Sequence, residues 1–437
     1  MTLTRPFIAK LLVPLVAFAA TLGAVLLLNR SSAPSGSAAP AGGAFAAPGA
    51  STDAQIAALE RNLADSPDNS QLYAALGGAF LQKARETGDP TLYTRAETAF
   101  RQGLRRDPHD AGTLTGVGAL ALARHDFEGG LRYGLEAHAE APQVVRPLGV
   151  IVDAQIELGR YQAAARTLQR MVNLKPNLAS YSRVSYFREL HGDLDGAVAA
   201  MRLAVSAGGD ASENLAYVQT LLGNLEFERG KLGTAHAAYR LALARYPRYI
   251  PAQAGIARVE AARGRLDAAI RRYRSIVARL PLPEYVIALG EAELAAGRKA
   301  EARRDLALVQ IEERLLRRSG VNTDTELALF EANHGHPDRA VMLARRGWAA
   351  APSVRSADAL GWALTRSGRE AHGLRWAMRA LRLGSADPAF LYHAGMTARA
   401  AGRADLARRF LARSSARTPR WSPLYGPRAK RALEALR

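Results

Sequence analysis

Apolar and small residues recur every three or four positions along most of the chain, in paired runs that a glycine separates and a proline ends. One such unit has these positions at Leu215, Val218, Leu222 and Leu225 before Gly230, and at Ala235, Tyr239 and Ala242 before Pro247. This spacing is typical of amphipathic helices, so the unit is predicted to form two helices. Gly230 suits the turn between them because a residue without a Cβ readily adopts positive φ, and Pro247 ends the second helix.

The unit repeats along the chain. Its turn glycines recur at intervals of 33 to 38 residues, at Gly159, Gly192, Gly230, Gly264, Gly297, Gly335, Gly368 and Gly402. Pro108, Pro142 and Pro176 lie 34 residues apart. A fixed period of this size indicates a stack of similar helix pairs, since one pair cannot bury its apolar face alone.

The residues inside each unit resemble the tetratricopeptide repeat family, whose pattern is Leu-Gly, an aromatic residue, then alanines around an aromatic residue and a closing proline. The first unit carries this pattern at Leu76-Gly77, Ala96, Phe100 and Pro108, and the sixth at Ile256, Gly264, Ala269, Tyr273 and Pro281. The chain is similar to membrane-anchored bacterial members of this family. The resemblance implies an all-α fold: a right-handed α-solenoid of about ten helix-turn-helix repeats with an N-terminal transmembrane helix.

The ends of the solenoid follow from the same pattern. The repeats are expected to occupy residues 52–419, with a first amphipathic helix over Thr52–Asp65 and a capping helix within residues 420–437 that opens near Pro427. Two 38-residue intervals between turn glycines predict extra loop residues near Gly208-Gly209 and Ser319-Gly320.

The N-terminal 30 residues have the composition of a membrane segment. Arg5 and Lys10 precede an uncharged run of 18 residues, Leu11 to Leu28, which is at the lower limit for crossing a bilayer. Residues 1–30 are therefore predicted to be an uncleaved signal anchor, with the positive end cytoplasmic and the repeats outside. The alternative is a secreted chain, released by cleavage of a signal peptide. Residues 31–51, rich in Ala, Gly, Ser and Pro, are predicted to be a flexible linker.

The charge is concentrated in the second half of the chain. Residues 241–437 hold 36 Lys and Arg against 18 Asp and Glu, whereas residues 51–240 hold 20 against 22. An anionic partner would suit the basic half, and phospholipid headgroups or envelope polymers suit an anchored, outward-facing protein better than nucleic acid does. Nucleic acid is not expected because no recognised reading module accompanies the charge.

Catalysis has little support in the sequence. The chain has no cysteine, no phosphate-binding glycine-rich loop, no nucleophile elbow and no HExxH motif. His334-Gly335-His336 has ligand-like spacing, but polar residues are expected in a turn, so neither a metal nor another cofactor is predicted. The chain is therefore not expected to be an enzyme.

The family resemblance implies that the first helix of each repeat lines a concave groove and that its outward residues meet the ligand. Carried over by repeat position, these are Arg146, Asp153, Arg183, Tyr186, Tyr217, Asn224, Arg258, Glu291, Asp358, Trp362 and Tyr392. Aromatic and arginine side chains dominate binding hot spots, which suits peptide recognition.

The expected function is that of a non-catalytic, membrane-anchored scaffold that binds a protein or peptide in this groove. The alternative is an adaptor for anionic envelope polymers or phospholipid headgroups, acting through the basic residues 241–437.

Overall fold

A computed structural model describes residues 51–208, 212–384 and 386–436. The predicted anchor over residues 1–30 and nearly all of the linker over residues 31–51 lie outside this part. The described residues are helical, with no strand among them. None of their helices combines the length and the hydropathy that a membrane span needs.

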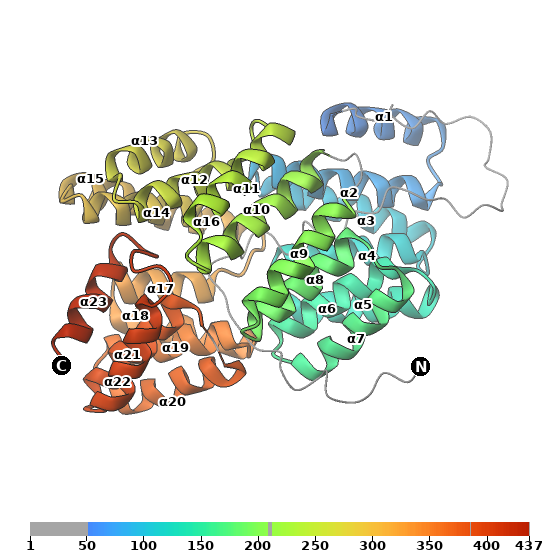
Figure 1. Ribbon diagram of the computed structural model, residues 1–437. Coiled ribbons are helices and arrows are strands. Elements are labelled where there is room, and N and C mark those ends of the chain that lie inside the picture. Colours follow the sequence, from blue (N-terminus) through green and yellow to red (C-terminus); the bar gives the residue numbers. More distant parts are fainter. Residues whose placement is uncertain (1–50, 209–211, 385, 437) are drawn as a thin grey trace. The chain divides into compact units, whose positions relative to one another are not determined.

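Successive helices form pairs along the chain, and short turns join one helix to the next (Figure 1). Their bounds are α1 (Thr52–Asp65), α2 (Ser70–Thr87), α3 (Thr91–Arg106), α4 (Ala111–Ala123), α5 (Phe127–Glu140), α6 (Val145–Glu157), α7 (Tyr161–Leu174), α8 (Leu178–Leu190), α9 (Leu194–Ser206), α10 (Ser212–Glu228), α11 (Leu232–Arg245), α12 (Ile250–Ala262), α13 (Leu266–Val277), α14 (Pro283–Ala295), α15 (Lys299–Leu306), α16 (Val309–Arg318), α17 (Asp324–His334), α18 (Pro337–Ala350), α19 (Val354–Arg366), α20 (Glu370–Ala380), the short 3₁₀ helix η2 (Leu381–Leu383), α21 (Pro388–Ala400), α22 (Ala404–Ser415) and α23 (Tyr425–Glu434).

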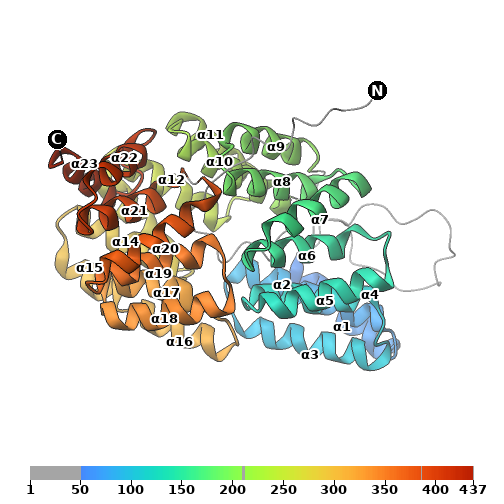
Figure 2. The ribbon, with the colours of Figure 1, turned by 90° about the horizontal axis from the view of Figure 1, so that it is seen from below.

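Each repeat consists of a first helix and a second helix. The first helices are α2, α4, α6, α8, α10, α12, α14, α17, α19 and α21. The first helix of a repeat packs on its own second helix, as in α10 with α11 and α19 with α20, and first helices of consecutive repeats also touch, as in α10 with α12 and α19 with α21. Figure 2 shows the same succession of pairs from below. The helical-repeat architecture implied by the tetratricopeptide resemblance is confirmed.

The turns between paired helices carry the glycines for the predicted reason in most repeats. Gly230 has φ +79°, and His125 takes the same place in an earlier repeat with φ 60°. Gly335 is an exception, with φ −125°. There the Glu331 carboxylate accepts a hydrogen bond from the backbone N–H of His336 at 2.9 Å and shapes the turn instead.

The chain divides into two compact units. Among the described residues, the N-terminal unit comprises residues 51–180 and 315–322, and the C-terminal unit comprises residues 181–314 and 323–436 without the gaps named above. In the N-terminal unit, residues 315–322 are held by the α4–α5 turn. Arg124 Nε donates to the Ser319 carbonyl at 3.0 Å, and His125 Nδ1 lies 2.6 Å from the Asn322 carbonyl oxygen.

The extra residues before Gly335 do not all lie in a loop, which corrects the sequence expectation. The second helix of that repeat, α15, ends after eight residues at Leu306, and the chain then forms the additional helix α16 before Gly320. Most of the extra residues therefore keep helical hydrogen bonds, within α16. The other predicted insertion, at Gly208-Gly209, extends into residues that the structure does not describe.

Close approach of the helices in the C-terminal unit depends on glycines around Tyr239. This side chain is fully buried and its hydroxyl donates to Asn224 Oδ1 at 2.7 Å. A Cβ added to Gly223 or Gly255 would lie only 2.5 or 2.4 Å from the Tyr239 ring. The ring therefore occupies the space that side chains would otherwise fill between α10 and α12.

We expect Gly255→Ala to lower the free energy of unfolding by about 1–3 kcal/mol, because the new methyl group overpacks the Tyr239 ring. Gly233→Ala is the matched control. A Cβ at Gly233 meets nothing within 4 Å, so this change should leave stability unchanged or raise it slightly. Urea denaturation followed by helical circular dichroism measures both; equal effects would contradict the close packing.

The C-terminal unit closes on itself through the segment that follows α22. Thr418 Oγ1 donates to the Phe227 carbonyl at 3.0 Å, and Trp421 packs against apolar clusters on both sides of the segment. The capping helix α23 begins at Tyr425, two residues before the predicted Pro427, and buries Ala432 against the last repeat. The segment 416–424, called the strap below, thus joins the last repeat to α10.

Candidate binding surface

Buried or partly buried glutamates recur four residues before the turn glycine in consecutive first helices. They are Glu226, Glu260, Glu293 and Glu331, and each is paired with an arginine: Arg229 and Arg202, Arg272, Arg274, and Arg339 respectively. The glutamate at this position of the repeat therefore forms an ion pair with an arginine near the end of the first helix. Part of the arginine excess in the second half of the chain has this structural role.

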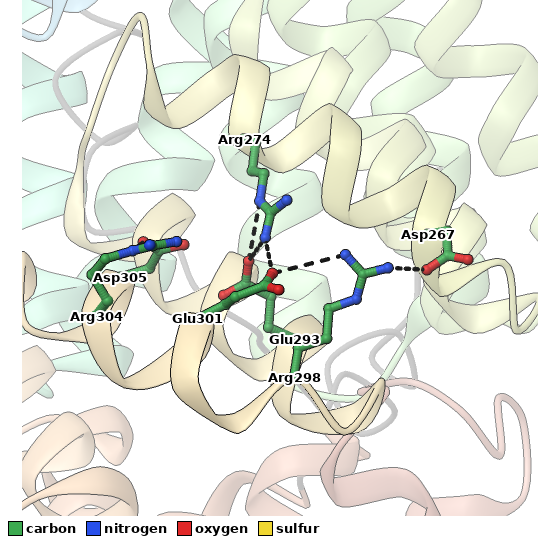
Figure 3. A network of polar contacts seen from close by, with 7 residues as sticks. All are labelled: Asp267, Arg274, Glu293, Arg298, Glu301, Arg304 and Asp305. Carbon is green, nitrogen blue, oxygen red and sulfur yellow. Dashed lines mark hydrogen bonds and ion pairs between the residues drawn. The ribbon is translucent and has the colours of Figure 1, made fainter.

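Figure 3 shows the network around Glu293, which links α13, α14 and α15. Arg274 donates to Glu293 at 2.7 Å and also to Glu301, and Arg298 donates to Asp267 at 2.7 Å. Burial raises the pKa of Glu293, while the hydrogen bond from Arg274 opposes that rise. These contacts tie one repeat to the next and leave little charge for a ligand.

A different group of charged residues, from separate repeats, meets inside the C-terminal unit. It consists of Glu189 on α8, Glu228 on α10, Arg258 on α12 and Asp387, the N-cap of α21, and is called the acid–arginine cluster here. Glu228 is 8% exposed and Asp387 1%. Glu228 raises the pKa of both Glu189 and Asp387, so carboxyl groups from α8, α10 and the start of α21 are neighbours.

Several polar atoms of the cluster lack hydrogen bonds. Asp387 Oδ1 accepts from the backbone N–H groups of Ala389 and Phe390, at 2.5 and 3.2 Å. Asp387 Oδ2, Glu228 Oε2 and Arg258 Nε are buried without a partner within the described part of the chain. The Arg258 guanidinium lies 3.9 Å above the Phe227 ring. Unsatisfied buried groups of this kind cost about 1–3 kcal/mol each and call for an explanation.

The carboxyl groups respond to this environment. Burial raises the pKa of Glu228 to about 8, although Arg258 and Arg417 act in the opposite direction. Burial raises the pKa values of Glu189 and Asp387 well above the usual range, and the neighbouring Glu228 raises both further. Burial therefore outweighs the effect of the arginines on Glu189 and Glu228.

Aromatic and imidazole rings gather beside the cluster in the last repeats. His393 stacks on Trp362 with ring centroids 4.6 Å apart, and its Nδ1 lies 2.8 Å from Asp358 Oδ2. Tyr392 packs between Trp362 and Tyr425, at 5.9 and 5.5 Å. All five residues are buried, so they form the support of this region and do not contact solvent freely.

His334 lies beside the same group of rings, next to Tyr425. Its Nε2 lies 3.2 Å from Glu291 Oε1 and 3.4 Å from the Tyr425 hydroxyl. Across the residues that the structure describes, no three or more His, Asp or Glu side chains are arranged to hold a metal ion.

The expectation that the first-helix residues face outward is wrong for six of them. Asp153, Arg183, Tyr217, Asp358, Trp362 and Tyr392 are buried. The partly exposed ones are Arg146, Tyr186, Asn224, Arg258 and Glu291. First helices of consecutive repeats touch, so large side chains at this position fill the space between them. Arg146 and Asp153 belong to the N-terminal unit, and the other nine to the C-terminal unit.

The structure brings Glu291, Asp358, Trp362 and Tyr392 together around the two histidines, and it places Arg258 in the acid–arginine cluster. Sequence reasoning missed Glu189, Glu228 and Asp387. Asp387 was recognisable as a helix N-cap, because Asp followed by proline commonly opens a helix. Its neighbours were not recognisable, since Glu189 and Asp387 lie 198 residues apart in the chain.

Known proteins resemble this chain only in part. No protein-family model matches. Cellulose synthase 1 operon protein C of Komagataeibacter xylinus is 26% identical over 242 residues, which is 52% of this chain and 16% of that protein. The chain therefore spans only a small part of the length of this relative.

Solved structures resemble this chain only distantly. The tetratricopeptide-repeat protein TTC0263 of Thermus thermophilus is 21% identical, with a TM-score of 0.37 over 42% of this chain and 94% of that one. The human IFIT1 dimer with PPP-AAAA is 13% identical, with a TM-score of 0.46 over 82% of this chain and 93% of that one. At this level of overlap the likeness assigns no partner or ligand to this chain.

Proposed function

We propose that the chain is a non-catalytic, membrane-anchored scaffold that binds a segment of a partner protein on the first-helix surface of its C-terminal unit. This surface is formed by the side chains of α8, α10, α12, α14, α17, α19 and α21. The observation that carries the proposal is the set of buried polar atoms without partners on Glu228, Arg258 and Asp387.

The energetics favour a binding role over a purely structural one. A carboxyl oxygen left buried without a hydrogen bond destabilises the fold, whereas the buried Glu226 has both carboxylate oxygens hydrogen-bonded, to Arg202 and Arg229. A partner segment that supplies hydrogen bonds would recover that energy. Because the groups come from α10, α12 and α21, one short segment would contact several repeats, as repeat proteins commonly bind.

Site-specific photo-crosslinking in cells tests this proposal. A benzoylphenylalanine in place of the partly exposed Tyr186 on α8 is expected to capture a protein partner. The control positions are Leu203 on α9 and Leu241 on α11, which are 52% and 55% exposed on second helices. Products that arise only from Leu203 or Leu241 would contradict binding on the first-helix surface.

The anchor and the extracytoplasmic placement belong to the same proposal. The uncharged run from Leu11 to Leu28 behind two basic residues supports them. Alkaline phosphatase fused after Arg437 should be active, and the purified chain should still begin near Met1. An inactive fusion, or a chain that begins within residues 31–51, would contradict an uncleaved anchor with the repeats outside.

A second function, contact with an anionic surface, is favoured by the second helices of the last repeats. The Arg379 guanidinium lies 4.6 Å from the Trp348 ring and 5.5 Å from the Trp376 ring. Met342 on α18 and Met378 on α20 are exposed. On α22, partial burial and the neighbouring Arg409 and Arg417 lower the pKa of Arg413, so three guanidinium groups lie close together.

Sedimentation with phosphatidylglycerol and with phosphatidylcholine vesicles tests this second function. Preferential binding to the anionic vesicles that is lost in Arg409→Gln/Arg417→Gln and at several hundred millimolar salt would support it. Equal binding to both vesicles would contradict it. Competition by a single-stranded RNA at equal charge would point to nucleic acid instead.

A further inference from the structure

We propose that the acid–arginine cluster is a subsite for a cationic side chain, the guanidinium of an arginine or the ammonium of a lysine, in the partner segment. The inference rests on the proposed function and names the chemistry that this surface would recognise.

The acceptors are in place and unused. Glu228 Oε2 on α10 and Asp387 Oδ2 at the start of α21 are both at least nine-tenths buried and without hydrogen-bond partners in the described structure. The Glu228 carboxylate raises the pKa of Asp387, and neither of these two oxygens has a hydrogen-bond partner. A donor placed between them would satisfy both, as an arginine or lysine head group does with several carboxylate oxygens.

The cations of the chain that face the cluster leave Glu228 Oε2 and Asp387 Oδ2 without a hydrogen bond in the described structure. Those facing the cluster are Arg258, Arg355 and Arg417. Arg258 is stacked on Phe227, and Arg355 NH2 lies 3.9 Å from Glu326 Oε1. The remaining charged neighbour is Asp358, which repels the Asp387 carboxylate and is bound to His393.

The raised pKa values of Glu189, Glu228 and Asp387 persist in the presence of these arginines. Burial is the largest cause of each shift, and two carboxyl oxygens of the cluster still lack a hydrogen bond. An additional anion would raise these pKa values further, whereas an additional cation would lower them and would donate to the two oxygens.

Two members of the cluster, Glu189 and Arg258, are partly exposed, while Glu228 and Asp387 lie deeper. A long, flexible side chain that ends in a charge matches this arrangement, because its apolar stem would pass the partly exposed residues and its head group would reach the buried oxygens.

Binding of a cation would be coupled to release of a proton. At neutral pH the Glu228 carboxyl is mostly protonated, since its pKa is about 8. A guanidinium or ammonium group beside it favours the carboxylate, so the carboxyl O–H bond breaks and its proton passes to solvent. No other bond changes, and the ligand keeps its own charge.

Ethylguanidinium chloride is the probe that tests the subsite, with N-ethylurea as its neutral counterpart of the same shape. Titration calorimetry at pH 7, in two buffers with different ionisation enthalpies, should show saturable binding of ethylguanidinium with release of protons. Glu228→Gln should weaken binding at least tenfold and reduce the number of protons released. Equal binding of N-ethylurea, or an unchanged affinity in Glu228→Gln, would overturn the proposal.

Two further variants make the result specific. Asp387→Asn should also weaken binding at least tenfold, while its remaining carbonyl oxygen can still cap α21. Glu136→Gln, at an exposed ion pair on α5, should bind as the wild type does. Loss of binding in Glu136→Gln as well as in Glu228→Gln would contradict a subsite at the cluster.

The source of the cation is decided by three more ligands. Acetyl-Ala-Ala-Arg-Ala-amide should bind more tightly than ethylguanidinium, because the peptide adds contacts on the first-helix surface. Tighter binding of spermidine than of this peptide would assign the subsite to free amines, and equally tight binding of magnesium would assign it to inorganic cations; either would overturn the proposal.

The subsite and the proposed function fail separately. If ethylguanidinium binds through Glu228 but crosslinking from Tyr186 captures nothing, the subsite stands and the scaffold function fails. If Tyr186 captures a partner equally well in wild type and in Glu228→Gln, the scaffold function stands and the subsite fails.

Discussion

Glu228→Gln is expected to raise the free energy of unfolding by on the order of 3 kcal/mol at pH 7 and to leave it unchanged near pH 4. The reason is the buried carboxyl group, which glutamine replaces with a neutral side chain of the same size. The same change should weaken binding of a cation. The wild-type Glu228 would therefore lower the stability of the free protein and contribute to binding of the ligand.

The sign follows from proton binding. The pKa of Glu228 is 4.5 in its ordinary state and about 8 in the folded protein. Between these values the unfolded chain has lost the proton and the folded chain has kept it. The stability of the wild type therefore falls as pH rises from 4.5 to 8, by about 1.4 kcal/mol per pH unit for this group. Glutamine has no such proton, so the difference between the two proteins grows over the same interval.

Urea denaturation of both proteins at pH 4, 6, 7 and 8 measures this difference. Glu136→Gln is the control, because it removes one carboxyl group at an exposed position. A difference between wild type and Glu228→Gln that is the same at pH 4 and pH 8 would contradict a buried carboxyl with a raised pKa.

Gly230→Ala is expected to cost about 2–5 kcal/mol of stability, and Gly297→Ala only about 1–2 kcal/mol. Both glycines have φ +79°, so the backbone penalty for a Cβ is the same at the two positions. They differ in their surroundings. A Cβ at Gly230 would lie 2.3 Å from the Arg417 carbonyl oxygen, whereas a Cβ at Gly297 would meet nothing within 4 Å.

The extra cost at Gly230 comes from displacement of the strap, residues 416–424. Thr418 is hydrogen-bonded to the Phe227 carbonyl, so a strap forced away from the turn would lose that bond as well. Urea denaturation gives the two stabilities, and limited proteolysis reports cleavage within the strap. Equal costs for the two alanines, with no added cleavage in Gly230→Ala, would show that the strap does not depend on this turn.

The sequence by itself determined the local structure of this protein. The first helix was predicted over Thr52–Asp65 and has these bounds in the structure, and the turn at Gly230 has the positive φ that its glycine suggested. Such features depend on helical periodicity, caps and glycine, whose effects extend over a few residues. The helix pairs and their repetition follow from that local information.

Only the tertiary structure decided which side chains are buried and which distant residues meet. Trp362 and Tyr392 occupy repeat positions expected to face a ligand, yet both are buried, because contact between consecutive first helices encloses them. Glu189 and Asp387 become neighbours across 198 residues when the repeats and the strap close the C-terminal unit. A repeat pattern specifies contacts between adjacent units, but the summed rotation of several units sets which non-adjacent side chains converge. That sum is a property of the packed helices, so the candidate binding surface could be recognised only in three dimensions.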